Sequence, residues 1–264
     1  MIEIDWNPSP ALGPLTVNWY GLTFVLGFVV AWFLVRRWSR RYGLPVNHVD
    51  DAITWIAVGS IIGARLYFVA QNDLLEYLRV PWTILAVWEG GLAFFGGLFG
   101  ATVAGYFYAR RHRLLFGRFA DLFAPAIPIG AAIGRTTCGL AGMDYGTPTS
   151  VPWGVVYTNA ASYAPVDGIA RHPTQFYELA GDLVIAAVLL RLRGRLPEGA
   201  LFPAYLVMFS VLRFGLFFVR GDVPAVALGL TNGHWTALGI LAFAVPACAV
   251  LFRRTRQLTT VNSV

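Results

Sequence analysis

Six arginines in this sequence lie apart from the other basic residues. All twenty strongly basic residues are arginines, and fourteen of them fall in four short clusters between apolar segments. The other six lie inside or beside apolar segments, where a charge is costly and usually has a function. They are Arg65, Arg79, Arg135, Arg171, Arg213 and Arg220. Because the planar guanidinium group matches the oxygens of a phosphate, this set predicts an anion site for a phosphate group.

Arg135 and Arg213 are the strongest candidates, because both are expected deep within apolar helices. Arg65 lies late in another such helix, and Arg220 is expected at the end of the helix that carries Arg213. The spacing of Arg213 and Arg220 predicts one shared helix face, with about 10 Å between them along the axis. A structural role is the alternative, in which the arginines pair with acidic residues or extend to the membrane interface. The acidic candidates are Glu89, Glu178 and Asp182.

The densest polar run beside an apolar segment reads RHPTQFYE, over residues 171–178. Pro173 suits the first turn of a helix, so His172 is expected just before it, at the outer interface. Histidine titrates near neutrality, which makes His172 a candidate general base; a purely structural role for it is equally open. Gln175, Tyr177 and Glu178 lie in the first turns of the same expected helix and are candidate substrate-binding residues.

Two glycine-rich stretches accompany these charges. The first reads WEGGLAFFGGLFG over residues 88–100 and contains Gly96 and Gly97, which are candidate substrate-binding residues. It favours close helix packing, or else a broken or re-entrant segment whose backbone N–H groups face a polar cavity. The second reads GRTTCG over residues 134–139 and combines Arg135 with Cys138. A cysteine beside an arginine can be reactive, whereas a buried inert thiol is the more common case.

The composition requires a membrane scaffold to position these residues. The chain has 264 residues, of which 57% are hydrophobic and 13% charged. A soluble domain carries about twice that charged fraction. The net charge of +6 does not indicate a nucleic-acid partner, because the basic clusters alternate with apolar spans as cytoplasmic loops do. Cys138 and Cys248 both lie in apolar segments and form neither a disulfide framework nor a metal-ligand spacing.

Seven segments are apolar and long enough to be transmembrane helices of about 20 residues. They are Tyr20–Val35, Ala52–Ala70, Leu92–Ala109, Phe119–Ala141, Gln175–Leu190, Leu201–Val219 and Trp235–Phe252. The four arginine clusters follow the first, third, fifth and seventh segments, so the positive-inside rule places those ends in the cytoplasm. The expected fold is therefore an all-α polytopic membrane protein, with its N-terminus outside and its C-terminus in the cytoplasm. We expect one integral membrane domain over residues 1–264, with an external loop or small subdomain at 142–173.

In this order, the residues resemble the prolipoprotein diacylglyceryl transferase family of the bacterial inner membrane. The resemblance covers nearly the whole chain and rests on several short motifs. They are GPL (13–15), NWYGL (18–22), GARL (63–66), WEGG (88–91), GGLFG (96–100), GR (134–135) with Gly142 and Gly146, RHPTQFYE (171–178), RF (213–214) and FVRGD (218–222). The family's seven-helix topology agrees with the one expected here.

The resemblance implies a reaction and a set of roles. The diacylglyceryl group of phosphatidylglycerol passes to the thiol of a lipobox cysteine, and glycerol phosphate leaves. Arg135 and Arg213 would carry the phosphate, with Arg65 and Arg220 in support and with Tyr20 and Gly146 shaping the pocket. The implied partners are phosphatidylglycerol, prolipoprotein signal peptides and membrane lipid, and the resemblance implies no metal or cofactor. The implied location is the bacterial cytoplasmic (inner) membrane.

Four positions depart from the family's pattern. The family usually has His before the glycine pair of the third helix, where this chain has Phe95. An asparagine is replaced by Cys138, a nearby acidic residue by Met143 with Asp144 adjacent, and a glutamate of the sixth helix by Phe217. These changes favour a second hypothesis, a divergent member that binds or handles phospholipid without catalysing the transfer or that acts on an altered substrate. A small transporter is the third class, although no internal repeat supports it.

Overall fold

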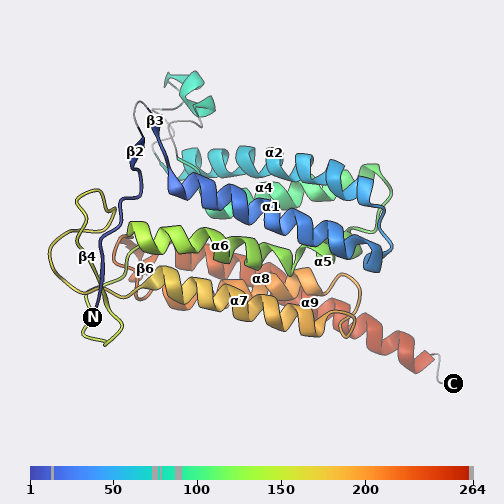
Figure 1. The fold of residues 1–264 in the computed structure, drawn as a ribbon. Coiled ribbons are helices and arrows are strands. Elements are labelled where there is room, and N and C mark those ends of the chain that lie inside the picture. Colours follow the sequence, from blue (N-terminus) through green and yellow to red (C-terminus); the bar gives the residue numbers. More distant parts are fainter. Residues whose placement is uncertain (13–14, 73–76, 78, 87–90, 262–264) are drawn as a thin grey trace. The chain divides into compact units, whose positions relative to one another are not determined.

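The computed structural model describes the chain except for residues 13–14, 73–76, 78, 87–90 and 262–264. Two compact units are present, one formed by residues 1–34 and 123–264 and the other by residues 35–122. Helix α1 (Trp19–Ser39) contributes to both. Figure 1 shows the helices and short strands along the chain.

Residues 35–122 form a unit built mainly on two antiparallel helices. Its helical elements are η1 (Arg40–Tyr42), α2 (Val46–Gln71), η2 (Pro81–Leu85), α4 (Phe94–Arg111) and most of α5 (Phe116–Phe123). Helices α2 and α4 pack along their length, because glycines face each other at the contact. A Cβ atom on Gly63 would come within 2.9 Å of the backbone nitrogen of Gly100. The glycine-rich stretch is thus helical from Phe94 onward and serves close packing, whereas the part at 87–90 lies outside the described residues.

The other unit holds the second half of the chain. Its elements are α6 (Ala126–Ala141), α7 (Thr174–Leu192), α8 (Leu201–Leu216), α9 (Asn232–Val261) and the short strands β1 (Ile2–Ile4), β2 (Ala11–Leu12), β3 (Leu15–Thr16), β4 (Val155–Tyr157), β5 (Ala225–Ala227) and β6 (Leu230–Thr231). Helix α6 packs on α7, α7 on α8 and α8 on α9. Close approach again uses glycine, since a Cβ on Gly139 would collide with the ring of Phe176.

All seven expected apolar segments lie largely within helices, with three corrections to their limits. The third begins at Phe94 rather than Leu92. The fourth, Phe119–Ala141, is divided between α5 and α6, because Pro125 precedes the first turn of α6 and interrupts the helical hydrogen bonds. The sixth ends at Leu216 rather than Val219. Residues 219–221 instead pair with residues 145–147 through bonds such as Thr147 N–H to the Val219 carbonyl, 2.8 Å. Arg213 and Arg220 therefore do not share a helix face.

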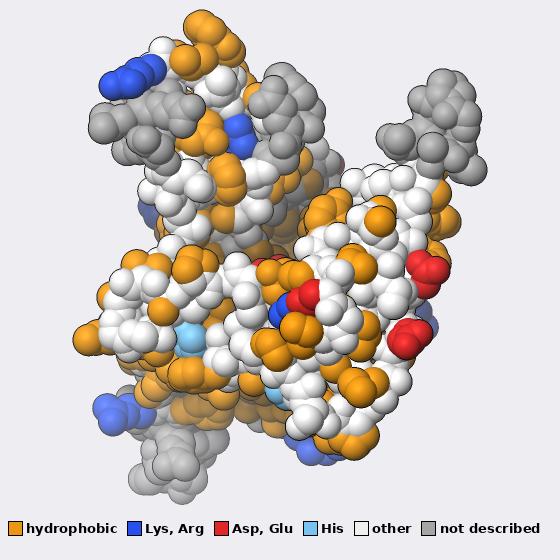
Figure 2. Space-filling model, turned by 90° about the vertical axis from the view of Figure 1, so that its left-hand side faces the viewer, with side chains coloured by type: hydrophobic (Ala, Val, Ile, Leu, Met, Phe, Trp, Pro, Cys, Tyr) orange, Lys and Arg blue, Asp and Glu red, His pale blue; other side chains and the backbone are white. Residues whose placement is uncertain are grey.

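Among the described residues, four helical stretches are both long and apolar enough to cross a membrane. They are Trp19–Tyr42, Val46–Gln71, Phe116–Ala141 and Asn232–Arg253, and α8 is a shorter apolar helix. Large apolar side chains are exposed on these helices, among them Phe33 on α1, Ile62 on α2 and Phe243 on α9. These helix surfaces fit contact with lipid, so the protein is a helical membrane protein. Figure 2 shows the side that is on the left in Figure 1, where hydrophobic side chains are interspersed with polar ones and with a few charged ones.

The loop at 142–173 folds as a small subdomain together with the N-terminus. Strand β1 pairs in parallel with β4, with Ile4 opposite Tyr157. Val155, Tyr157 and Ala164 form a buried cluster against which Ile4 and Tyr145 pack. The Tyr157 hydroxyl donates to the carbonyl of Gly139 at the end of α6, 2.9 Å. The subdomain is therefore attached directly to the helix that carries Arg135.

Candidate functional site

The site begins where α6 ends. Arg135 lies in the last two turns of α6, and the helix stops at Gly142, whose φ of 76° is the left-handed conformation typical of a helix C-terminus. Asp144 follows with a φ of 57°, a conformation that Asp tolerates better than most residues. This turn brings the Asp144 carboxylate back to Arg135, whose Nη1 binds its Oδ2.

Glu178 binds two buried arginines from neighbouring helices. Its Oε1 is 3.0 Å from Nη2 of Arg135, and its Oε2 is 2.6 Å from Nη1 of Arg213. The side chains of Glu178 and Arg213 are 6% and 5% exposed, so the contact is made away from water and is electrostatically strong. Helix α7 supplies the carboxylate, while α6 and α8 supply the cations.

Arg220 extends the cluster from the turn after α8. Its Nη2 is 2.8 Å from Asp144 Oδ1, and its Nε is 2.8 Å from Asp222 Oδ1. Arg135, Asp144, Glu178, Arg213 and Arg220 together form what we call the arginine–carboxylate site. Each of its two carboxylates binds two arginines, which ties α6, α7 and α8 to the turn at Arg220.

Two members of the site, Asp144 and Arg220, lie outside the helices, and their pKa values are shifted by the neighbouring charges. Burial by itself would raise the pKa of Asp144, but the guanidinium groups of Arg135 and Arg220, with Arg213 behind them, outweigh it and hold that pKa at about 2. Burial likewise disfavours the charged form of Arg220, yet the hydrogen bond to Asp222 and the charge of Asp144 raise its pKa overall. Asp144 and Arg220 are therefore both ionised at neutral pH.

The first turn of α7 positions the Asp144 turn. The Thr174 hydroxyl donates to the Asp144 carbonyl, and the Gln175 amide donates to the Met143 carbonyl. Gln175 is 1% exposed and also lies 3.5 Å from the Tyr157 hydroxyl. In this structure Gln175 thus connects α7 to the loop, and its predicted contact with substrate stays a prediction.

Gly146 is required by the backbone around it. Its N–H donates to the His172 carbonyl, 3.1 Å, and the Gly221 N–H donates to the Tyr145 carbonyl, 2.9 Å. A Cβ on Gly146 would collide with the carbonyl and Cβ of His172. The segment that follows Asp144 is therefore clamped between the residue before α7 and the turn after α8, a packing role that the sequence did not indicate.

His172 pairs with Tyr177 rather than with the arginines. Its Nδ1 lies 3.2 Å from the Tyr177 hydroxyl, which accepts a 2.7 Å hydrogen bond from Trp153 Nε1. Arg171, the neighbour of His172, turns to Asp167, 2.5 Å, and to the ring of Tyr145. The partly exposed imidazole has the chemistry of a general base, and that assignment stays a prediction.

Tyr20, at the start of α1, lies close enough to Arg135, Cys138 and Asp144 to interact with them electrostatically. Tyr20 is 38% exposed. Its predicted role in shaping the pocket stays a prediction. Cys138 is buried and lies one turn after Arg135 on α6, and the expectation that its thiol is inert stays a prediction.

Arg65 belongs to the unit of residues 35–122 and binds backbone. It donates to the carbonyls of Ile84, 2.9 Å, Thr83, 2.5 Å, and Gly91, 3.2 Å. Gly96 and Gly97 lie on α4 against α2, where Gly97 faces Ser60. In this structure these three predicted substrate-binding residues organise α2, α4 and the segment between them. Glu89, the proposed partner of an arginine, lies outside the described residues.

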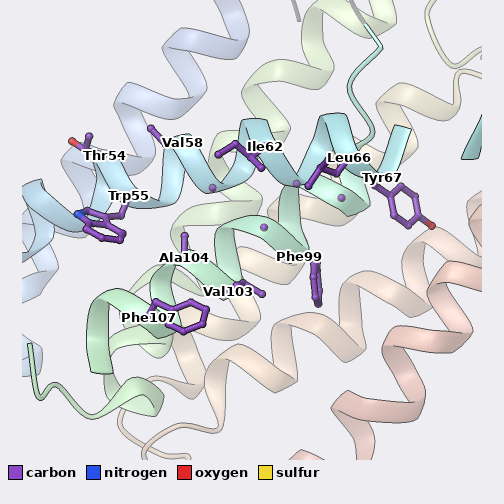
Figure 3. Close-up of a pocket in the computed structure, with 14 residues that line it drawn as sticks. Thr54, Trp55, Val58, Ile62, Leu66, Tyr67, Phe99, Val103, Ala104 and Phe107 are labelled. Atoms are coloured by element: carbon purple, nitrogen blue, oxygen red, sulfur yellow. The ribbon is translucent and has the colours of Figure 1, made fainter. Parts of the chain in front are cut away.

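A groove between α2 and α4 lies in the same unit, with a volume of about 850 Å³. Figure 3 shows apolar side chains of both helices around it, among them Trp55, Ile62 and Phe99. Among the described residues that line it, none is acidic, arginine or histidine, and the lining is almost entirely apolar.

Three of the four departures from the family's pattern are Phe217, Met143 and Phe95, and their surroundings differ. Phe217 lies against two site arginines, with its ring centre 4.7 Å from the guanidinium carbon of Arg213 and 5.2 Å from that of Arg220. These distances are typical of cation–π contacts, in which the ring is attracted to the guanidinium group without carrying a charge. Met143 contributes its backbone carbonyl to Gln175, and Phe95 pairs with the ring of Phe94.

Asp144 is the site residue that the sequence analysis left out of its candidates. Its signal was an acidic residue in a glycine-rich turn, between the expected end of the helix and Gly146. Asp182, in contrast, was a predicted partner of an arginine. Within the described part of the chain, neither of its carboxylate oxygens has a hydrogen-bond partner. Buried Tyr205 and Ser210 have side-chain oxygens in the same condition. No metal-binding cluster of three His, Cys, Asp or Glu residues occurs among the described residues.

The fold and the site define a helical membrane protein with a buried arginine–carboxylate site beside a small strand-containing subdomain. A family model described as prolipoprotein diacylglyceryl transferase matches residues 10–250. The chain therefore belongs to the prolipoprotein diacylglyceryl transferase family.

Relatives agree with this assignment over most of their length. A phosphatidylglycerol–prolipoprotein diacylglyceryl transferase of Geobacter sulfurreducens is 37% identical over 236 residues, 88% of this chain and 88% of that protein. Proteins of the same name from Nitratidesulfovibrio vulgaris and Methylococcus capsulatus are 35% identical, over 87% of this chain and 85% of that protein, and 32% identical, over 92% and 94%.

Proposed function

We propose that this protein transfers the diacylglyceryl group of phosphatidylglycerol to the lipobox cysteine thiol of prolipoproteins and releases glycerol phosphate. The observation that carries the proposal is the meeting of Arg135, Arg213 and Arg220 around the shared carboxylates of Asp144 and Glu178. Family membership and the names of the relatives support the same reaction.

The chemistry needs stabilisation of negative charge on the leaving group. The thiolate sulfur attacks the glyceryl carbon, the carbon–oxygen bond breaks, and its electron pair stays on the phosphate. Arg135 and Arg213, with Arg220 beside them, supply donors for those oxygens in a site that excludes most water, where such donors act strongly. Tyr20 and the segment at Gly146 bound the same region.

The thiol proton needs an acceptor, because the thiolate and not the thiol is the nucleophile. His172 is the proposed base. Its ring is held by Tyr177 at the outer end of α7, next to the helix turn that carries Glu178. The proton passes from the thiol sulfur to an imidazole nitrogen and then to water.

The proposed substrates allow the membrane, the number of spans and the orientation to be inferred, which the apolar helices alone do not define. We infer seven spans with the N-terminus outside, in the bacterial cytoplasmic membrane, with phosphatidylglycerol and prolipoprotein signal peptides entering from the lipid. Substituted-cysteine labelling in a Cys248→Ser background tests the orientation. An impermeant maleimide should modify Ala161→Cys in intact cells and Arg113→Cys only after lysis; the reverse pattern contradicts the orientation.

A transfer assay tests the function directly. Purified protein, phosphatidylglycerol in detergent and a lipobox peptide should yield a thioether-linked diacylglyceryl peptide and glycerol phosphate. Arg135→Lys and Arg213→Lys keep the charge but lose the planar fork, and we expect each to reduce the rate by about 100-fold. Arg171→Lys is the matched control, because Arg171 is equally buried but binds Asp167.

A second candidate function follows from Phe217, which places a neutral ring where the family has a glutamate. A phospholipid-binding member without transferase activity would bind phosphatidylglycerol and yield no thioether. Product formed by the wild-type protein rejects this alternative, whereas binding without product supports it.

A further inference from the structure

Together with Asp222, which pairs with Arg220, the arginine–carboxylate site is balanced in charge before any substrate enters, with three arginines and three carboxylates. In the described part of the chain, its ion pairs join three arginines to Asp144, Glu178 and Asp222. A phosphodiester brings a further negative charge. Close contact between its oxygens and the guanidinium groups therefore requires that a carboxylate give up its place, because like charges in a buried site repel strongly.

Asp144 and Glu178 differ in how firmly they are held. Glu178 projects from the first turns of α7, and its side chain is 6% exposed. The side chain of Asp144 is 31% exposed, and it stands on a turn with a left-handed φ of 57°. Backbone strain of this kind costs about 1 kcal/mol or more and is found at ligand-binding positions. Asp144 can turn toward water, whereas Glu178 is enclosed by helices.

The two carboxylate oxygens of Asp144 bind the arginines in the way that two oxygens of a phosphate could. One carboxylate oxygen binds Arg135 on α6, and the other lies 2.8 Å from Arg220 after α8. Two phosphate oxygens can bind the same two guanidinium groups, since a phosphate, like a carboxylate, offers paired acceptor oxygens to guanidinium N–H donors.

We propose that Asp144 is an internal anion that occupies the phosphate position between Arg135 and Arg220 and is displaced by the lipid phosphate. The proposal rests on the proposed function for its substrate and adds a residue that sets specificity and release. Asp144 weakens phosphate binding by competing for the arginines. After transfer, the Asp144 carboxylate binds the two arginines again. It thereby displaces the glycerol phosphate product, which carries more negative charge than the lipid phosphodiester and is repelled by the carboxylate.

The test is Asp144→Asn, which keeps the size of the side chain and tolerates the left-handed backbone. Initial rates are measured against the mole fraction of phosphatidylglycerol, with sn-glycerol 1-phosphate as product inhibitor. We expect KM for the lipid and the inhibition constant each to fall about tenfold, the effect that one nearby charge commonly has on an ionic equilibrium. An unchanged or raised KM overturns the proposal.

Two control variants separate this role from general effects of charge. Asp167→Asn removes a side chain of similar exposure, 34%, that pairs with Arg171 outside the site, and should change neither constant. Asp222→Asn removes a partner of Arg220 that has no contact with Arg135, and its effect should be smaller. Equal effects of Asp144→Asn and Asp222→Asn contradict a bridging role.

A binding measurement keeps the proposal independent of catalysis. Labelled phosphatidylglycerol and diacylglycerol are bound to each full-length variant in detergent, with inorganic phosphate as competitor. Tighter binding of phosphatidylglycerol alone, more readily competed by phosphate, supports the proposal even if the wild-type protein forms no thioether, in which case only the proposed function fails. Tighter binding of both lipids, or of neither, overturns it.

Discussion

Arg135 and Arg213 bind opposite oxygens of one carboxylate, that of Glu178, although they lie on different helices. This shared partner aligns two guanidinium groups that would otherwise repel each other. It also means that neither arginine can be altered without affecting the other, since both depend on one buried acid, whose side chain is 6% exposed.

Glu178→Gln should therefore harm both stability and activity. Loss of the shared carboxylate leaves two buried cations less compensated, and breaking a buried ion pair commonly costs about 3–5 kcal/mol. We expect a clear drop in the thermal unfolding temperature in detergent and a loss of transfer activity. Glu198→Gln, on the loop between α7 and α8, should leave both near the wild-type values. A stable, active Glu178→Gln protein would contradict the pairing.

His172→Gln should slow the transfer by about 100-fold or more if the imidazole takes the thiol proton. The defect should shrink as pH rises toward about 8.5, where a free cysteine thiol ionises without help. Tyr177→Phe removes the ring's hydroxyl partner and should have a weaker effect. Rates of both variants across pH check this. A defect that is equal at all pH values points to a structural role instead.

Gly146→Ala should destabilise the turn that carries Asp144. Its new methyl group would collide with the carbonyl and side chain of His172, whereas a Cβ on Gly134 meets nothing within 4 Å. Overpacking of this kind typically costs about 1–3 kcal/mol. Thermal unfolding of the two alanine variants should show a loss only for Gly146→Ala, because Gly134→Ala adds a good helix former to α6. Equal stability of the two proteins would be inconsistent with the backbone contact.

Asp144 should make the protein sensitive to acid. Its pKa of about 2 in the folded state lies below the value of about 3.9 in an unfolded chain. Its stabilising contribution is therefore complete above about pH 4 and is lost as pH falls toward 2, by at most about 2 kcal/mol given its partial exposure. Unfolding measured between pH 5 and 2 should show this loss in the wild-type protein and a smaller one in Asp144→Asn. Parallel curves would contradict the ion pairs of Asp144.

The sequence by itself determined the membrane character, the positions of the apolar helices and the deep placement of Arg135 and Arg213. These follow from local composition and period, because apolar runs and arginine clusters are visible without any long-range contact. The motifs also identified the family, which the comparisons confirmed. Glu178 was named both as a partner of the arginines and as a substrate-binding residue, and the structure gives it the first of these contacts.

Only the tertiary structure decided which arginines share a site and which acid completes it. Arg65 and Arg135 look alike in the sequence, yet one binds backbone carbonyls and the other two carboxylates. Asp144 depends on the left-handed turn after α6, and Arg220 on backbone pairing with residues 145–147. These contacts join residues far apart in the chain through turn geometry and steric fit, which no local pattern encodes.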